Sequence, residues 1–229
     1  SYVIKKAVAI ITARGGSKRI PHKNIRPFLE RPIISYSIQA ALSSGAFDEV
    51  MVSTDSEEIA QVAREYGARI PFFRSAQTAG DYASTDEVIY EVLQAYEKQG
   101  IRFERFCCIY PTAPFLTADK LKQAMSLLDT SESVMPVVPF SYPPQRGLIL
   151  EGGRRKYPEY QNARSQDLEK LYHDCGQFYA CRTDAFLRDK TTDVEDLVPM
   201  ILSEMEVQDI DTEEDWEIAE LKYRKMAGL

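Results

Sequence analysis

Strand-like and helix-like segments alternate through the first 138 residues, and this rhythm limits the possible fold more than any other feature. Short apolar runs predict strands at residues 8–12, 49–53, 106–110 and 134–138. Between them apolar residues recur at helical spacing, for example from Ile59 to Tyr66. Such alternation is typical of a mostly parallel sheet covered by helices. We therefore expect an α/β fold with its ligand site beyond the carboxyl ends of the strands.

Capping residues mark where the expected helices begin and end. Helix ends are expected at three glycines, which adopt the left-handed conformation most easily: Gly45, Gly67 and Gly100. Asp55 or Ser56 is expected to cap one helix and Thr85 another. Near the end of the chain, Thr212 with Asp215 approximates a capping box that opens the last helix.

The alternation stops after Pro139. A proline pair, a glycine pair and a basic triplet interrupt any helix between residues 140 and 172, so this segment is expected to be an insertion. Strand character returns at residues 177–181, and a last strand is expected at residues 207–211. We expect a single domain over residues 1–229 that carries residues 140–172 as an inserted arm.

Composition excludes several classes of protein. The net charge of −7 argues against a nucleic-acid partner. No run of eighteen apolar residues predicts a membrane helix, and the polar start of the chain is unlike a secretory signal. The four cysteines form no C-x-x-C pair, which disfavours a zinc or redox site. Reduced thiols in a cytoplasmic protein are the expectation.

Charge is distributed unevenly along the chain. Residues 1–29 hold seven Lys and Arg but no Asp or Glu, whereas residues 191–221 hold no Lys or Arg and many carboxylates. One end therefore suits an anion and the other a cation, as a metal–triphosphate substrate requires. Two solvated faces of opposite sign would give the same counts.

The loop at residues 13–24 follows the first expected strand. Gly15 and Gly16 allow backbone N–H groups to approach an anion, and Arg14, Lys18 and Lys23 add positive charge. The loop matches neither G-x-x-x-x-G-K-[ST] nor G-x-G-x-x-G, so a Walker loop and a dinucleotide cofactor are disfavoured. A basic surface turn is the alternative, and phosphate binding is the interpretation that we favour.

Two carboxylates, Asp209 and Asp211, lie two residues apart on the last expected strand. Residues at this spacing point to the same side of a strand, while Ile210 between them points to the core. Adjacent carboxylates repel each other unless a cation lies between them, and Mg²⁺ is typically held by one or two carboxylates with water and phosphate. A cap residue beside a solvated turn residue is the alternative for this pair.

Four motifs in order resemble the CMP-sialic acid synthetases and their relatives, over about residues 8–222. They are the loop Arg14–Asn24, the strand end Ser53–Asp55, Tyr110–Pro114 and Asp209–Thr212. The resemblance implies a Rossmann-like nucleotidyltransferase fold and a homodimer in which residues 140–172 reach the partner subunit. It implies that the anomeric hydroxyl of a nine-carbon sugar acid attacks the α-phosphate of CTP and releases pyrophosphate, for surface glycan or flagellin glycosylation.

The resemblance also assigns roles to individual residues. Phosphate contacts fall on Arg14, Ser17, Lys18 and Lys23, of which Lys23 and Arg14 are expected to be catalytic. The cytidine ribose and base fall to Asn24, Arg74 and Thr85. The resemblance implies that Asp209 and Asp211 are the magnesium ligands and that Asp211 is also catalytic. Tyr179 is expected to line the sugar pocket. A solvated arginine at position 74 and a core tyrosine at position 179 are the alternatives.

Two departures from the sialic acid enzymes concern the sugar. Tyr110 stands where those enzymes have glutamine, and Cys175 stands where they have asparagine. Residues 164–176 and 206–212 instead look like the pseudaminic acid cytidylyltransferases. The expected sugar pocket comprises four more candidates besides Tyr179: Tyr110, His173, Asp174 and Gln177. His173 and Asp174 as a purely structural pair is the alternative.

Three other functions are alternatives to this one. Within the family, the alternative is a synthetase for N-acetylneuraminic, legionaminic or KDO acid, which Tyr110 and residues 164–174 disfavour. A nucleotide-binding regulatory protein is a different class, disfavoured because Lys23, Asp209 and Asp211 are all present. An acidic interaction scaffold would not account for the basic loop that lacks carboxylates.

Overall fold

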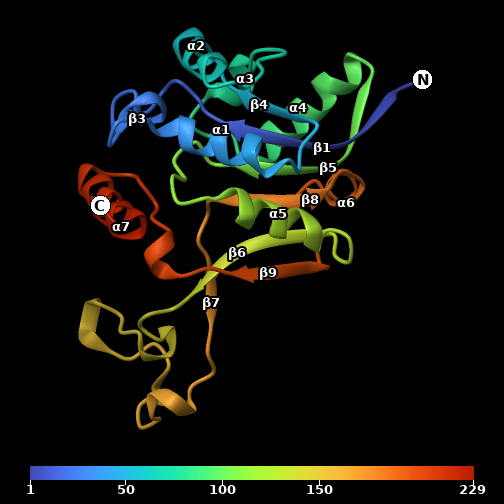
Figure 1. The fold of residues 1–229 in the computed structure, drawn as a ribbon. Helices are drawn as coiled ribbons and strands as arrows, with labels where there is room; N and C mark the ends of the chain where they lie inside the picture. Colours follow the sequence, from blue (N-terminus) through green and yellow to red (C-terminus); the bar gives the residue numbers. More distant parts are fainter.

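A computed structural model describes residues 1–229, and a seven-stranded sheet forms its centre (Figure 1). The strand order is β4-β1-β5-β8-β6-β7, with β9 on the other side of β6. Five strands run in one direction, because β4, β1 and β5 are parallel, β6 lies antiparallel to the reversed β8, and β9 is parallel to β6. The expected α/β fold with a mostly parallel sheet is thus confirmed. The bounds are β1 Val3–Thr12, β4 Glu49–Ser53, β5 Ile101–Ile109, β6 Ser133–Pro139, β7 Tyr172–Asp174, β8 Phe178–Arg182 and β9 Leu197–Ile201.

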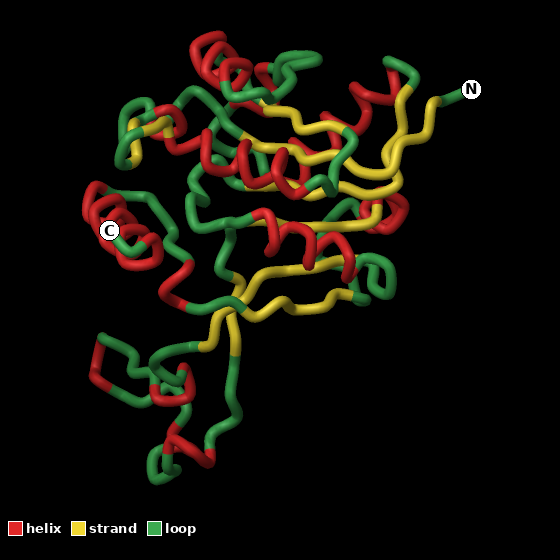
Figure 2. The backbone as a smooth tube through the Cα atoms, in the orientation of Figure 1, coloured by secondary structure: helices red, strands yellow, loops and turns green.

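Helices cover both faces of the sheet because side chains alternate along its buried strands. In β1, Ala9 and Ile11 pack toward α1, α2 and α5, while Val8 and Ile10 pack toward α4 and α6. Figure 2 shows the resulting layers of helix around the strands. The helix bounds are α1 Ile33–Ser44, α2 Glu57–Glu65, α3 Ala76–Ala79, α4 Thr85–Lys98, α5 Ala118–Leu127, α6 Thr183–Asp189 and α7 Glu213–Ala227. None of them is both long and apolar enough to cross a bilayer.

The expected caps are confirmed except at one helix. Gly45, Gly67 and Gly100 all have positive φ, at 65°, 99° and 79°. Ser56 caps α2 by accepting a hydrogen bond from the Ile59 backbone N–H. The prediction that Thr85 caps α4 is wrong, because the side chain of the preceding serine accepts from the backbone of residue 87. Thr85 is therefore the first helical residue, and its side chain is available to the neighbouring cavity.

The prediction of a strand at residues 207–211 is wrong. After β9 the chain makes a 3-10 turn at Glu204–Glu206 and then runs without strand pairing to Thr212, which opens α7 through the predicted capping box. The sheet position is taken instead by β9, which contains Pro199 and was not predicted. Proline is tolerated there because β9 is an edge strand, where one row of N–H groups needs no partner.

A small hydrophobic cluster, separate from the packing on the two faces of the sheet, explains why residues 207–212 still lie where they were expected. Ile210 is 1% exposed and packs with Phe28 and Trp216, which joins the last loop to α7 and to the short hairpin of β2 (Pro27–Phe28) and β3 (Arg31–Pro32). The predicted inward direction of Ile210 is thus confirmed, although no strand pairing produces it.

Residues 140–172, called the arm from here on, extend from the layered body between β6 and β7 (Figure 1). The arm has no helix longer than a 3-10 turn, and none of its residues is buried. It therefore adds nothing to the core of its own chain. The arm begins where the alternation of strands and helices was predicted to stop. The role of the arm in a dimer stays a prediction.

Candidate active site

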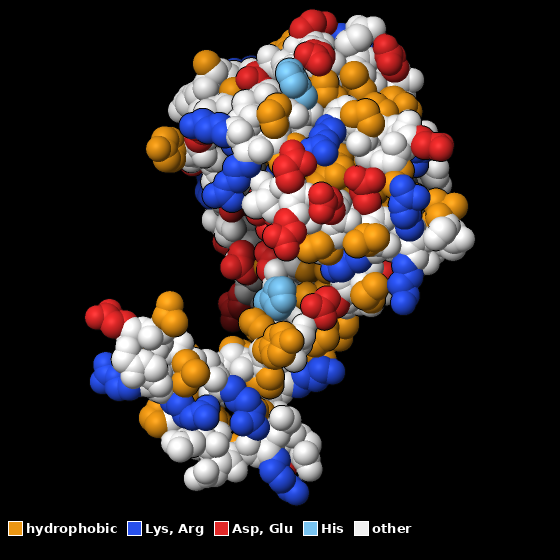
Figure 3. All heavy atoms as spheres, turned by 90° about the vertical axis from the view of Figure 1, so that its left-hand side faces the viewer, with side chains coloured by type: hydrophobic (Ala, Val, Ile, Leu, Met, Phe, Trp, Pro, Cys, Tyr) orange, Lys and Arg blue, Asp and Glu red, His pale blue; other side chains and the backbone are white.

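Two adjoining cavities open beyond the carboxyl ends of β1 and β5, where the fold predicts a ligand site. One has a volume of about 250 Å³ and the other about 440 Å³, and Tyr110, the residue after β5, lines both. Figure 3 looks at this side of the molecule, where acidic side chains gather on the body above the hollow that separates it from the arm. The cavities share a wall, so two bound molecules can meet beside Tyr110.

The smaller cavity, called the nucleotide cavity here, brings together residues from distant parts of the sequence. Among its lining residues are six of the seven predicted for phosphate, ribose and base: Arg14, Ser17, Lys23, Asn24, Arg74 and Thr85. Lys18 is the one that does not line it. Its side chain is 81% exposed, and its ammonium lies 2.8 Å from the Asp81 carboxylate.

Hydrogen bonds from neighbouring residues fix the glycine loop, residues 13–24, in place. The Gly15 backbone N–H donates to Asp55 Oδ1 at 2.8 Å, and a Cβ at Gly15 would lie 3.2 Å from Ser56 Cβ, so the position has little room for a side chain. Asn24 Nδ2 donates to the carbonyl of Arg14 at 2.9 Å. Asn24 therefore shapes the loop as well as lining the cavity.

Arg74 is buried, contrary to the alternative of a solvated arginine. Its guanidinium donates to Ser53 Oγ at 3.1 Å and to the Ser53 carbonyl at 2.9 Å. Burial lowers the pKa of Arg74 from its usual value, while the negative charge of nearby Asp55 partly offsets this by raising the pKa. A buried guanidinium that is fixed by two hydrogen bonds presents its remaining donors to the cavity in a defined direction.

Asp81 was missed by the sequence analysis and contacts two of the predicted phosphate ligands. Its carboxylate forms ion pairs with both Arg14 and Lys18. Hydrogen bonds from Lys18 and Arg14 lower the pKa of Asp81 to about 2. An anion therefore already lies against the cations that the sequence assigned to phosphate. No sequence signal marked it, because Asp81 lies more than 60 residues from its partners.

Lys23 links the glycine loop to the carboxylate pair. Its ammonium donates to the Ile210 carbonyl at 2.6 Å and lies 3.8 Å from Asp211 Oδ1. Burial, together with the neighbouring Asp211 carboxyl, raises the pKa of Asp209. The two carboxyl groups thus lie beside each other, as predicted, although their segment is not a strand. The structure contains no cluster of three or more metal-binding side chains.

The larger cavity, called the sugar cavity here, is lined by the predicted Tyr110, His173, Asp174 and Tyr179, and also by Asp209. Tyr179 donates its hydroxyl to Asp174 Oδ2 at 2.7 Å, and its oxygen lies 3.4 Å from the Tyr110 hydroxyl. Burial and these two neighbours raise the pKa of Tyr179, so the phenol stays protonated. Tyr179 is therefore a cavity residue, and the alternative of a core tyrosine is wrong.

His173 and Asp174 do not pair through their side chains. His173 Nδ1 lies 3.0 Å from the backbone oxygen of Asp174, and its ring packs on Phe140 with centroids 4.7 Å apart. The Asp174 carboxylate instead accepts from the Gly176 backbone N–H at 2.8 Å and from Tyr179. Both residues line the cavity, so each is available to a ligand independently of the other.

Gln177 is the predicted sugar residue that the structure does not bring to either cavity. It is 3% exposed and has a φ of 82°, and its carbonyl accepts from the Tyr110 backbone N–H at 2.9 Å. Gln177 thus helps to position Tyr110 through a backbone hydrogen bond, and its buried side chain does not reach either cavity. The sugar cavity also has lining residues that the sequence analysis did not name, among them Glu204, Gln208 and Lys222.

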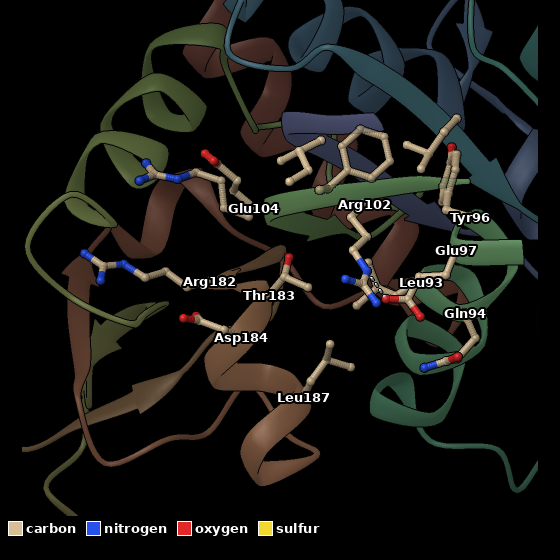
Figure 4. A pocket seen from close by; sticks show the side chains of 14 residues that line it. Leu93, Gln94, Tyr96, Glu97, Arg102, Glu104, Arg182, Thr183, Asp184 and Leu187 are labelled. Atoms are coloured by element: carbon tan, nitrogen blue, oxygen red, sulfur yellow. Dashed lines mark hydrogen bonds and ion pairs between the residues drawn. The ribbon is translucent and has the colours of Figure 1, made fainter. Parts of the chain in front are cut away.

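A third cavity, of about 580 Å³, lies at the opposite end of the sheet. It is formed by the amino-terminal halves of β1 and β5 together with α4 and α6 (Figure 4). An ion pair of 2.8 Å between Arg102 and Glu97 crosses part of it. None of the predicted site residues lines it, so the larger volume does not make it the candidate active site.

Comparison with known proteins identifies the family. The model of the family described as cytidylyltransferase matches residues 8–214. The chain belongs to this family. It is 42% identical to the pseudaminic acid cytidylyltransferase of Campylobacter jejuni, with 96% of this chain and 97% of that protein covered. It is 32% identical to the CMP-N,N'-diacetyllegionaminic acid synthase of Legionella pneumophila, with 94% and 95% covered.

A solved structure confirms the fold of this cytidylyltransferase. The structure of a CMP-2-keto-3-deoxy-manno-octonic acid synthetase complexed with CTP matches with a TM-score of 0.70, covering 98% of this chain and all of that one. The sequence identity is 16%, so this likeness concerns the arrangement of the elements only. The predicted resemblance to CMP-sialic acid synthetases and their relatives is confirmed by the family match and by the relatives above.

Proposed function

We propose that this cytidylyltransferase transfers CMP from CTP to the anomeric hydroxyl of pseudaminic acid, giving CMP-pseudaminic acid and pyrophosphate. The observation that carries the proposal is the meeting of the nucleotide and sugar cavities at Tyr110. The name of the 42% identical relative supports the choice of sugar, since that protein matches over nearly its whole length. The product suits surface glycan or flagellin glycosylation.

In the proposed reaction the sugar hydroxyl oxygen forms a bond to the α-phosphorus, the bond to the β-phosphate oxygen breaks, and the hydroxyl proton is released. Arg14 and Lys23 line the nucleotide cavity and would stabilise negative charge on the phosphates. The shared wall at Tyr110 would orient the hydroxyl toward the phosphorus. Catalysis would come mostly from positioning and charge stabilisation, as in other phosphoryl-type transfers.

Magnesium is proposed as the cofactor, with Asp209 and Asp211 as its protein ligands. The donor set fits, because Asp209 and Asp211 lie side by side, Asp211 is 3.8 Å from Lys23 of the glycine loop, and Mg²⁺ needs only one or two protein carboxylates. The bound ion would offset the charge of the triphosphate. We expect EDTA to abolish pyrophosphate release and Asp211→Ala to reduce the rate by about a hundredfold or more. Full turnover by Asp211→Ala would refute the assignment.

The sugar is tested with a panel of acids at fixed CTP. Pseudaminic acid should exceed N-acetylneuraminic acid in kcat/KM by roughly ten- to a hundredfold, because Tyr110 cannot supply both hydrogen bonds of a glutamine. Its ring also offers an apolar face to a deoxygenated chain end. Pyrophosphate release measures the rates. Equal kcat/KM values, or a preference for N-acetylneuraminic acid, would overturn the choice of sugar and leave the CTP chemistry in place.

Legionaminic acid is the second candidate, since the relative from Legionella pneumophila matches nearly the whole chain. It belongs in the same panel, together with KDO. If no acid in the panel releases pyrophosphate from CTP, the regulatory alternative replaces the enzyme.

A cytoplasmic location is also proposed, because all four cysteines are free and three of them are buried, which suits a reducing compartment.

A further inference from the structure

The sugar cavity is negatively charged for a site that would receive an acid. Three carboxylates line it, from Asp174, Glu204 and Asp209, while Lys222 is its only Lys or Arg. A sugar acid brings another carboxylate, which these groups would repel at close range. A cation within reach would therefore favour binding, and Lys222 is the one cationic side chain in the lining of this cavity.

Lys222 is held in place by backbone groups and is not neutralised by an acid. It extends from α7, and its ammonium donates to the carbonyls of Glu204 at 3.1 Å and Val207 at 3.0 Å. An ammonium has three donors, so one remains for a ligand. Carbonyl oxygens position the group but leave its full positive charge available.

The carboxylates of the cavity are occupied by other groups. Glu204 accepts from Ser141 Oγ at 2.9 Å, at the base of the arm. Asp174 accepts from Gly176 and Tyr179. Asp209 lies beside Asp211, whose Oδ1 is 3.8 Å from the Lys23 ammonium. None of these acids pairs with Lys222, so its charge faces a cavity in which a ligand carboxylate would be its partner.

We propose that Lys222 binds the carboxylate of the sugar acid. The proposal deepens the function above and rests on it. It gives α7 a part in substrate recognition, in addition to packing against the hairpin through Trp216. It also accounts for a lysine whose ammonium is hydrogen-bonded to two backbone carbonyls and has no acidic partner.

The main test is Lys222→Gln, which keeps a hydrogen-bond donor for the backbone carbonyls and removes the charge. The KM for the sugar acid should rise by about ten- to a hundredfold, because hydrogen bonds to charged groups are the stronger class. The KM for CTP and kcat at saturating sugar should change little. Lys222→Arg should restore part of the affinity. Lys225→Gln, exposed on the same helix, is the matched control and should behave as wild type.

A sugar whose carboxylate is replaced by a carboxamide separates charge recognition from a structural role. The wild-type enzyme should lose affinity for the carboxamide, whereas Lys222→Gln should treat acid and amide alike. If the variant weakens both sugars and CTP equally, Lys222 is only a tether and the proposal is overturned. An unchanged KM in an active variant overturns it too. A wild-type enzyme inactive with every sugar acid would instead overturn the proposed function.

Discussion

At the scale of single residues, Asp81 competes for the cations of the nucleotide cavity. Its ion pairs with Arg14 and Lys18 neutralise part of the positive charge that a phosphate would meet there. We expect Asp81→Asn to lower the KM for CTP by up to about fivefold with little change in kcat, since exposed ion pairs contribute little. Initial rates at varied CTP measure this, and Asp193→Asn serves as a control on another exposed loop. A higher KM for CTP would show that Asp81 assists binding.

Lys23 and Lys18 belong to the same loop but should have different kinetic effects. Lys23 lines the nucleotide cavity and touches the Ile210 carbonyl, whereas Lys18 is exposed and does not line that cavity. Lys23→Ala should lower kcat by about a hundredfold or more, because its charge is needed most as negative charge develops on the phosphates. Lys18→Ala should mainly raise the KM for CTP. Steady-state kinetics distinguish them, and a Lys23→Ala enzyme that loses only CTP affinity would contradict a catalytic role.

At the scale of elements, the turn into β8 sets the position of Tyr110. Gly176 has a φ of 71°, and a Cβ there would lie 3.1 Å from Tyr110 Cε2. Gly176→Ala should raise the KM for the sugar, because the ring must move. It should also lower Tm by roughly 2–8 °C, since a left-handed alanine costs about 1–2 kcal/mol.

The control for this turn is Gly100→Ala, at the turn between α4 and β5. Gly100 has a φ of 79° and no heavy atom within 4 Å of its would-be Cβ. The substitution therefore adds the same backbone strain without touching the site. Thermal unfolding and sugar KM are measured for both variants. Equal sugar KM values in the two would mean that Gly176 acts on stability alone.

At the scale of the whole molecule, the arm exposes apolar side chains that its own chain does not cover. Tyr142 is 88% exposed and Leu150 is 98% exposed, and no arm residue is buried. Exposed apolar groups that gather on one projecting segment are typical of an interaction surface. We predict a homodimer with the arm at its interface.

Light scattering at micromolar concentration measures the mass of the particle. The expected result is a dimer, and Leu150→Asp should shift the equilibrium toward the monomer and reduce activity. Leu229→Asp introduces the same charge at the exposed C-terminal residue and is the control. A monomeric wild-type protein with full activity would disprove the prediction.

Much of this molecule follows from local patterns in the sequence. Helical spacing, positive-φ glycines and the Thr212 capping box depend on residues within one or two turns of each other, so the alternation through residue 138 was predictable. The cationic loop and the acidic pair were predictable for a similar reason, because each is a short run with an unusual charge. The rule that ligands bind at the carboxyl ends of parallel strands placed the cationic loop beside the site, whereas the acidic pair reaches it on a loop that the buried Ile210 anchors.

Only the tertiary structure decided which distant residues form the walls of the site. Asp81 and Lys222 carry no local signal. The partners of Asp81 lie more than 60 residues away, and those of Lys222 lie outside its own helix, in the segment before α7. No strand was predicted at residues 197–201, and β9 forms there with Pro199 in it because an edge strand does not need the N–H that proline lacks. Gln177 was expected in the pocket, but the left-handed turn at the start of β8 buries it beneath Tyr110. Strand order and cavity walls depend on long-range packing, which short sequence patterns do not encode.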